Sequence, residues 1–210
     1  MSNANKSNPK DSAIFVLLTV IASLLLVLIF VVASKNNPKK GGVSQDQASS
    51  SSSSSSEWVN KKAPDFDLED FEGNKVSPAS LKGKNVVLFF TEGLMCYPAC
   101  WDQMARLGTD GRFNDEKTVA YSVIIDPKSE WKKAFDKMPE LRKTKVLFDV
   151  YRTASRSYNA LNVTSSMHQG SFPGHTYYLI DKEGIIRYYY DDPQMGIRND
   201  LIYEELKKIQ

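Results

Sequence analysis

Cys96 and Cys100 are the only cysteines of this 210-residue chain, and they are four residues apart. They follow an apolar run at residues 86–90 (VVLFF), which predicts a buried strand, and precede a predicted helix at residues 100–107. With Pro98 in the first helical position, Cys100 falls in the first turn and Cys96 just before it. The amides and dipole of a helix N-terminus stabilise a thiolate, which is the reactive form of cysteine. Residues four apart on a helical turn have Cα atoms about 6 Å apart, a distance that a disulfide can span. The spacing therefore indicates thiol–disulfide chemistry. The alternative is two buried cysteines that only pack in a core.

Near the N-terminus, residues 13–33 form an uncharged apolar run long enough to cross a bilayer as a helix. A cleaved signal peptide is the alternative, because residues 31–33 (VVA) resemble a cleavage site. The run exceeds the 7–15 residues of a signal core, which favours an uncleaved anchor. We therefore predict a polar N-terminus at residues 1–12 and a transmembrane anchor at residues 13–33.

After this span, residues 34–57 include eight consecutive serines and contain nothing that forms a core, so we predict a flexible linker. The lysines on the two sides of the span nearly balance and do not decide its orientation. The linker and the redox-type cysteines beyond it favour a single-pass membrane protein whose domain, residues 58–210, lies outside the cytoplasm. A net charge of +2 and the lack of a basic, aromatic-rich patch exclude a nucleic acid as the partner.

Beyond residue 58 the pattern predicts alternating strands and helices that end in a hairpin and a helix. This order describes an α/β domain of three layers. The predicted strands are residues 86–90, 119–125, 146–149, 176–181 and 185–190, and the predicted helices are residues 100–107, 130–137, 151–161 and 199–209.

Two separated segments carry a family resemblance. Residues 63–73 (APDFDLEDFEG), followed by Val76, Leu81 and residues 82–84 (KGK), are similar to the opening of the redoxin branch of the thioredoxin superfamily, the AhpC/TSA peroxiredoxin-like proteins. Residues 172–184 (FPGHTYYLIDKEG) resemble a later strand and turn of the same family. The resemblance implies a thioredoxin-like α/β/α domain with a central mixed sheet. It also implies protein thiols, disulfides or peroxide as substrates, with a membrane or extracytoplasmic electron donor.

The chain departs from the family in three places. Peroxiredoxins place the attacking cysteine in a Pro-x-x-x-Thr/Ser-x-x-Cys setting, and neither cysteine here has that proline or hydroxyl. Three residues separate the cysteines where thioredoxins have two, which alters the redox potential. His175 stands where thioredoxins have a cis-proline and peroxiredoxins often an arginine. Because both of those face the reactive cysteine, we expect His175 beside the pair.

The resemblance implies a membrane-anchored thiol–disulfide oxidoreductase with Cys96, Cys100 and His175 as its catalytic residues, and peroxidase or antioxidant activity as a further expectation. Cys96 would be the nucleophile, because it precedes the helix and should be the more exposed, and Cys100 would be the resolving cysteine. His175 would assist proton transfer or, when protonated, lower the pKa of a cysteine. A structural histidine at the start of a strand is the alternative. No organic cofactor is expected, since no phosphate-binding glycine loop occurs.

The sequence is also compatible with two other functional interpretations. In the first, Cys96, Cys100 and His175 bind copper, as in Sco-type copper chaperones, which share this fold; thiolates and imidazole suit copper. Trp101 departs from that pattern, which usually has proline after the second cysteine. In the second, the domain keeps the fold without redox activity. Of the neighbouring residues, Glu92 is expected to be a solvated loop carboxylate or a proton acceptor for a thiol, and Tyr97 and Trp101 either an apolar rim or ordinary packing.

Overall fold

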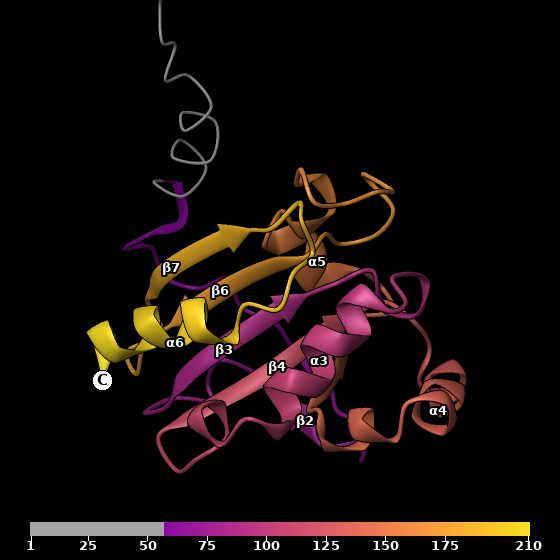
Figure 1. Cartoon of the computed structure of the whole chain (residues 1–210). Coiled ribbons are helices and arrows are strands. Elements are labelled where there is room, and N and C mark those ends of the chain that lie inside the picture. Colours follow the sequence, from indigo (N-terminus) through magenta and orange to yellow (C-terminus); the bar gives the residue numbers. More distant parts are fainter. Residues whose placement is uncertain (1–56) are drawn as a thin grey trace, which may run out of the picture. The chain divides into compact units, whose positions relative to one another are not determined.

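The computed structural model describes residues 57–210 (Figure 1). The predicted anchor at residues 13–33, and all but the last residue of the predicted linker, lie outside the described residues. Within residues 57–210, no helix is long and apolar enough to cross a membrane.

The centre of the fold is a seven-stranded sheet in the order β2-β1-β5-β4-β3-β6-β7. β3 pairs in parallel with β4, and β4 with β5, whereas the other pairs are antiparallel, so the sheet is mixed as predicted. The strands are β1 (Leu68–Glu69), β2 (Lys75–Val76), β3 (Asn85–Phe90), β4 (Thr118–Ile124), β5 (Val146–Phe148), β6 (Thr176–Ile180) and β7 (Ile186–Asp191).

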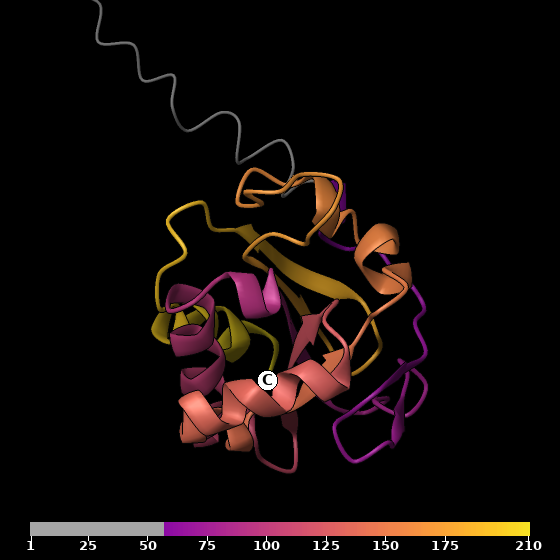
Figure 2. The same ribbon diagram turned by 90° about the vertical axis from the view of Figure 1, so that its right-hand side faces the viewer.

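The two faces of the sheet carry separate hydrophobic cores. All six residues of β3 are buried, and alternate residues point to opposite faces. Val87 and Phe89 join the core beneath the helices α3 (Ala99–Thr109), α4 (Lys128–Lys137) and α6 (Asn199–Leu206). The other face is covered by α5 (Thr153–Ser157) and the segment after Glu57, which packs Trp58 against Tyr158. Figure 2 shows the sheet between these layers, which is the predicted three-layer arrangement.

Two predicted helices are shorter than expected. The closing helix predicted at residues 199–209 ends at Leu206, and a 3-10 turn follows over Lys207–Ile209. The other difference is larger. Instead of a single helix over residues 151–161, α5 spans Thr153–Ser157 and a separate 3-10 turn spans Ala160–Asn162. The break lies at Asn159, whose φ of +50° is in the left-handed region, which asparagine visits more readily than most residues. The start is fixed by the buried Asp149 carboxylate, which accepts hydrogen bonds from the backbone amides of Ala154 and Ser155.

Candidate active site

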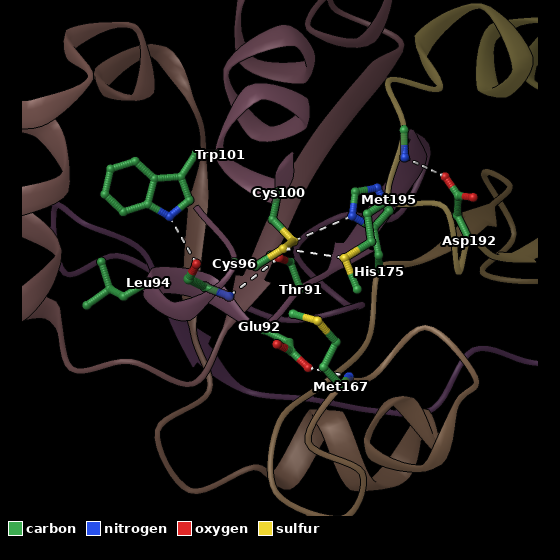
Figure 3. Close-up of a disulfide and its surroundings, with 12 residues drawn as sticks. Thr91, Glu92, Leu94, Cys96, Cys100, Trp101, Met167, His175, Asp192 and Met195 are labelled. Atoms are coloured by element: carbon green, nitrogen blue, oxygen red, sulfur yellow. Dashed lines mark hydrogen bonds between the residues drawn. A yellow bond between two sulfur atoms is a disulfide. The ribbon is translucent and has the colours of Figure 1, made fainter. Parts of the chain in front are cut away.

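Cys96 and Cys100 lie between the end of β3 and the first turn of α3, and their sulfur atoms form a disulfide (Figure 3). Their Cα atoms are 5.3 Å apart, close to the distance predicted from the spacing. Pro98 was predicted to be the first residue of the helix. Instead it immediately precedes the first helical residue, Ala99. Cys96 therefore stands just before the helix and Cys100 within its first turn, where the helix N-terminus favours a thiolate.

The two sulfurs differ in their access to solvent. Cys96 is 4% exposed and Cys100 is 0% exposed. The order agrees with the expectation that Cys96 is the more accessible of the two. The difference is small, however, and both cysteines are buried in the disulfide state.

His175 lies directly before β6 and faces the disulfide (Figure 3). Because β6 pairs antiparallel with β3, with Thr176 opposite Phe90, the start of β6 meets the loop that carries the cysteines. The His175 Nδ1 atom is 3.5 Å from Cys100 Sγ, so the expected proximity to the pair is confirmed.

The environment of His175 keeps its imidazole neutral. The side chain is fully buried, and this burial lowers its pKa to about 4, despite the opposing effect of the Asp192 carboxylate. The Nε2 atom is 2.8 Å from the Tyr177 hydroxyl. In the tautomer with its proton on Nε2, the ring donates to Tyr177 and presents an acceptor, Nδ1, to Cys100.

The loop before Cys96 is shaped by Gly93 and Asp126. Gly93 has a φ of +64°, and a Cβ atom there would lie 1.9 Å from the Asp126 carboxylate, so only glycine fits. Asp126 Oδ2 accepts a hydrogen bond from the Leu94 amide at 3.0 Å. Burial raises the pKa of the Asp126 carboxyl.

Glu92 differs from both of its expected roles. Its carboxylate is fully buried rather than solvated, and its hydrogen bonds go to another loop rather than to a thiol. Oε1 accepts from the backbone amides of Met167 and His168 at 2.7 and 3.2 Å, and Oε2 is 3.2 Å from His168 Nδ1. Glu92 therefore fastens the segment around Met167 beside the disulfide loop, as Figure 3 shows.

Trp101 and Tyr97 divide between the two readings proposed for them. Trp101 is buried, contacts the Trp131 ring, and donates from Nε1 to the Gly93 carbonyl at 3.0 Å, so it is a packing residue. Tyr97 is exposed, and Lys137 Nζ lies 3.5 Å from its ring centroid. Tyr97 thus remains on the surface beside the cysteines, in the position expected of an apolar rim.

Met195 is a site residue that the sequence did not reveal. It lies in the loop between β7 and α6, and its Sδ atom is 3.8 Å from Cys96 Sγ (Figure 3). The contact joins residues 99 positions apart, and no local pattern around Met195 points to it. Only the fold of the β7–α6 loop brings this thioether to the more accessible sulfur.

The donor atoms around Cys96 and Cys100 test the hypothesis that these residues bind copper. Within residues 57–210, no three His, Cys, Asp or Glu side chains are arranged to hold a metal ion, and the two cysteine sulfurs are bonded to each other. The thiolates released by reduction, the His175 imidazole and the Met195 thioether are the soft and borderline donors that suit copper. The chemistry of these donor atoms, rather than an arranged site, is therefore what is compatible with copper.

Residues 59–189 match the family model described as the AhpC/TSA family. A search of curated proteins gave no significant match.

Several solved structures share the fold at low sequence identity. They include peroxidoxin BcpB from Mycobacterium tuberculosis, with a TM-score of 0.60 and 18% identity over 73% of this chain and 98% of that one. The 2-Cys peroxiredoxin of Plasmodium vivax gives a TM-score of 0.61 and 22% identity over 73% and 82% of the two chains. A peroxiredoxin-like protein from Aquifex aeolicus gives 0.59 and 16% over 72% and 87%. These likenesses confirm the thioredoxin-like fold.

Proposed function

Because this chain belongs to the AhpC/TSA family, we propose that it is a redoxin that exchanges thiols and disulfides through the Cys96–Cys100 pair. The observation that carries the proposal is the disulfide itself, closed at the start of α3 with a buried, neutral His175 against one of its sulfurs. A purely structural disulfide has no need of a proton acceptor at that place.

In the proposed reaction, the Cys96 thiolate attacks one sulfur of a partner disulfide, forms a mixed disulfide and releases one partner thiolate. Cys100 then attacks the Cys96 sulfur, which releases the second partner thiolate and closes the Cys96–Cys100 bond. The pair loses two electrons and the partner gains them. Because Cys100 is completely buried, its proton leaves through the nearest acceptor, His175 Nδ1. The membrane or extracytoplasmic electron donor expected for the family would return the pair to its reduced form.

We propose peroxide reduction as a slower activity of the same pair. The Cys96 thiolate would attack a peroxide oxygen to form a sulfenic acid, which Cys100 would convert to the disulfide with release of water. The family supports this step, whereas the residues before Cys96 do not favour it: Phe89 and Gly93 occupy the places of the peroxiredoxin proline and hydroxyl. We therefore expect exchange to exceed peroxidase turnover.

We further propose that residues 13–33 anchor the protein and that the redoxin domain works outside the cytoplasm. The length of the apolar run and the serine-rich tether support this placement. A membrane-impermeant thiol reagent should label Cys96 in reduced whole cells. Labelling seen only after lysis would refute the orientation.

The proposed exchange is tested by catalysis of insulin reduction with dithiothreitol. The wild-type chain should accelerate the reaction, and Cys96→Ser should reduce it to the uncatalysed rate. Thr109→Ala is a matched control, because Thr109 is an exposed residue at the opposite end of α3. Equal rates for Cys96→Ser and the wild type would refute the proposal.

Copper delivery is a second candidate, supported by the donors around the pair. The His175 Nδ1 atom is 3.5 Å from one cysteine sulfur and Met195 Sδ is 3.8 Å from the other. Donors that share one metal ion are typically roughly 3–4 Å apart, given bonds of about 2.0–2.3 Å. Copper would be cargo here, bound only after reduction of the disulfide. Stoichiometric, tight copper binding by the reduced chain that is lost in His175→Ala would favour this function over exchange.

A further inference from the structure

Met195 takes no part in the proposed exchange, yet its thioether lies against Cys96, the less buried cysteine of the pair. Its thioether is 3.8 Å from Cys96 Sγ, about the contact distance of two sulfur atoms. Met195 is half-buried, whereas Met95 and Met167, which also lie near Cys96 in the chain or in space, are 52% and 62% exposed. Met195 is therefore held at the cysteine rather than left on the surface.

The loop that carries Met195 is fixed by a buried carboxylate. Asp192 Oδ2 accepts from the Gly196 amide at 2.9 Å and from Arg198 Nε at 2.7 Å, while Met195 N donates to the Asp192 carbonyl at 3.0 Å. Met195 has a φ of +48°, in the left-handed region that residues other than glycine seldom adopt. Strained backbone of this kind persists where the surrounding structure enforces it, and it gathers at functional sites.

A thioether in this place has a defined redox chemistry. A two-electron oxidant such as hydrogen peroxide converts methionine to its sulfoxide, with transfer of one oxygen atom and release of water. The sulfur of a sulfoxide is electrophilic, and a thiolate in contact with it is placed for attack. Met195 is only half-buried, which leaves its side chain open to a small oxidant, and Cys96 lies against its sulfur atom.

We propose that Met195 captures hydrogen peroxide as its sulfoxide and that the reduced Cys96–Cys100 pair reduces this sulfoxide back to methionine. The activity is an intramolecular methionine sulfoxide reductase, and it rests on the proposed function in that both require a redox-active pair. It gives the chain a route from peroxide to disulfide that does not depend on the proline and hydroxyl missing before Cys96.

The proposed step balances in atoms and electrons. The Cys96 thiolate attacks the Met195 sulfur, and the sulfoxide oxygen takes up two protons and leaves as water. Cys100 then attacks the Cys96 sulfur, displaces the restored thioether and closes the disulfide. The proton of Cys100 passes to His175 Nδ1 and from there to solvent. In sum, two thiols and one sulfoxide become one disulfide, one methionine and one water, and two electrons move from the pair to Met195.

Peptide mass spectrometry of the full chain tests the proposal. The disulfide form is treated with hydrogen peroxide, the excess is removed with catalase, and dithiothreitol is then added. Sulfoxide at Met195 should form during treatment and fall at least tenfold after reduction, while sulfoxide at Met167 persists as an internal control. In Cys96→Ser, and in wild-type chain left without reductant, the Met195 sulfoxide should remain.

Three results would overturn the proposal: Met195 stays unoxidised while Met167 is oxidised, its sulfoxide survives in the reduced wild type, or it disappears equally fast in Cys96→Ser. Insulin reduction measured on unoxidised samples separates the two hypotheses. A chain that reduces insulin and leaves the sulfoxide intact refutes this inference alone, whereas a chain that does neither refutes the proposed function as well.

Discussion

Acidification should destabilise the oxidised protein through His175, and replacement by glutamine should remove that part of the effect. The imidazole has a pKa of about 4 in the folded chain, against an ordinary value of 6.5, because it is buried. Between these values the unfolded chain binds a proton at this position and the folded chain does not. Stability is therefore full above pH 6.5 and falls as the pH decreases toward 4.

The magnitude follows from the gap between the two pKa values. The whole gap corresponds to about 3 kcal/mol, and about 2.5 kcal/mol of it is lost between pH 7.5 and pH 4.5. Asp110, Asp181 and Asp192 have lowered pKa values and also lose stabilisation in acid, but they are present in both proteins. The difference between the wild type and His175→Gln therefore reports the imidazole, including its charge interaction with Asp192.

Urea unfolding of the oxidised full chain, followed by tryptophan fluorescence at pH 7.5 and pH 4.5, measures this difference. The free energy of unfolding of the wild type should fall by about 2.5 kcal/mol more than that of His175→Gln, whose amide keeps a neutral partner for the Tyr177 hydroxyl. Tyr177→Phe is the control, because it removes the hydrogen bond but keeps the imidazole and with it the pH dependence. Parallel losses in the wild type and His175→Gln would refute the buried, neutral histidine.

Three further outcomes are expected. Glu92→Gln should lower the free energy of unfolding by about 2 kcal/mol, because it replaces a buried carboxylate that accepts hydrogen bonds from two backbone amides. His168→Ala should lower it by less than about 1 kcal/mol, and urea unfolding of both variants measures the difference. Asp192→Asn should cost about 3 kcal/mol in the same assay, because Arg198 loses its fully buried partner; an unchanged midpoint would contradict this. His175→Gln should slow closure of the disulfide about tenfold in stopped-flow measurements, or about 1.4 kcal/mol of barrier, and an unchanged rate would exclude proton transfer through His175.

Much of the fold could be predicted because its signals are local. The run at residues 86–90 is apolar on both faces, which is typical of a central strand, and every residue of β3 (Asn85–Phe90) is buried. The predicted helix at residues 151–161 was wrong in extent, since its apolar positions continue past Asn159 while the backbone there turns to positive φ. The spacing of apolar residues does not reveal this change of backbone conformation at Asn159.

The residues of the candidate site also differ in whether the local sequence reveals them. Cys96, Cys100 and His175 could be identified because the first two share a local spacing and the third occupies a position matched to a known family. Met195 and the buried state of Glu92 could not, because each depends on contacts between distant segments of the chain. Nothing in the loop sequence around Met195 encodes the distance of its sulfur from Cys96.

The most direct test of thiol–disulfide exchange by Cys96 and Cys100 is the capture of a mixed disulfide by single-cysteine variants. The reduced chain is mixed with a small disulfide such as oxidised glutathione, quenched with acid, and analysed by intact mass and peptide mapping. Cys100→Ser should carry one equivalent of glutathione on Cys96, because the resolving thiol is absent, and Cys96→Ser should carry almost none, because Cys100 is completely buried. An adduct on Cys100 in Cys96→Ser, with none in Cys100→Ser, would reverse the two roles, and the absence of any adduct in either variant would contradict thiol–disulfide exchange by this pair.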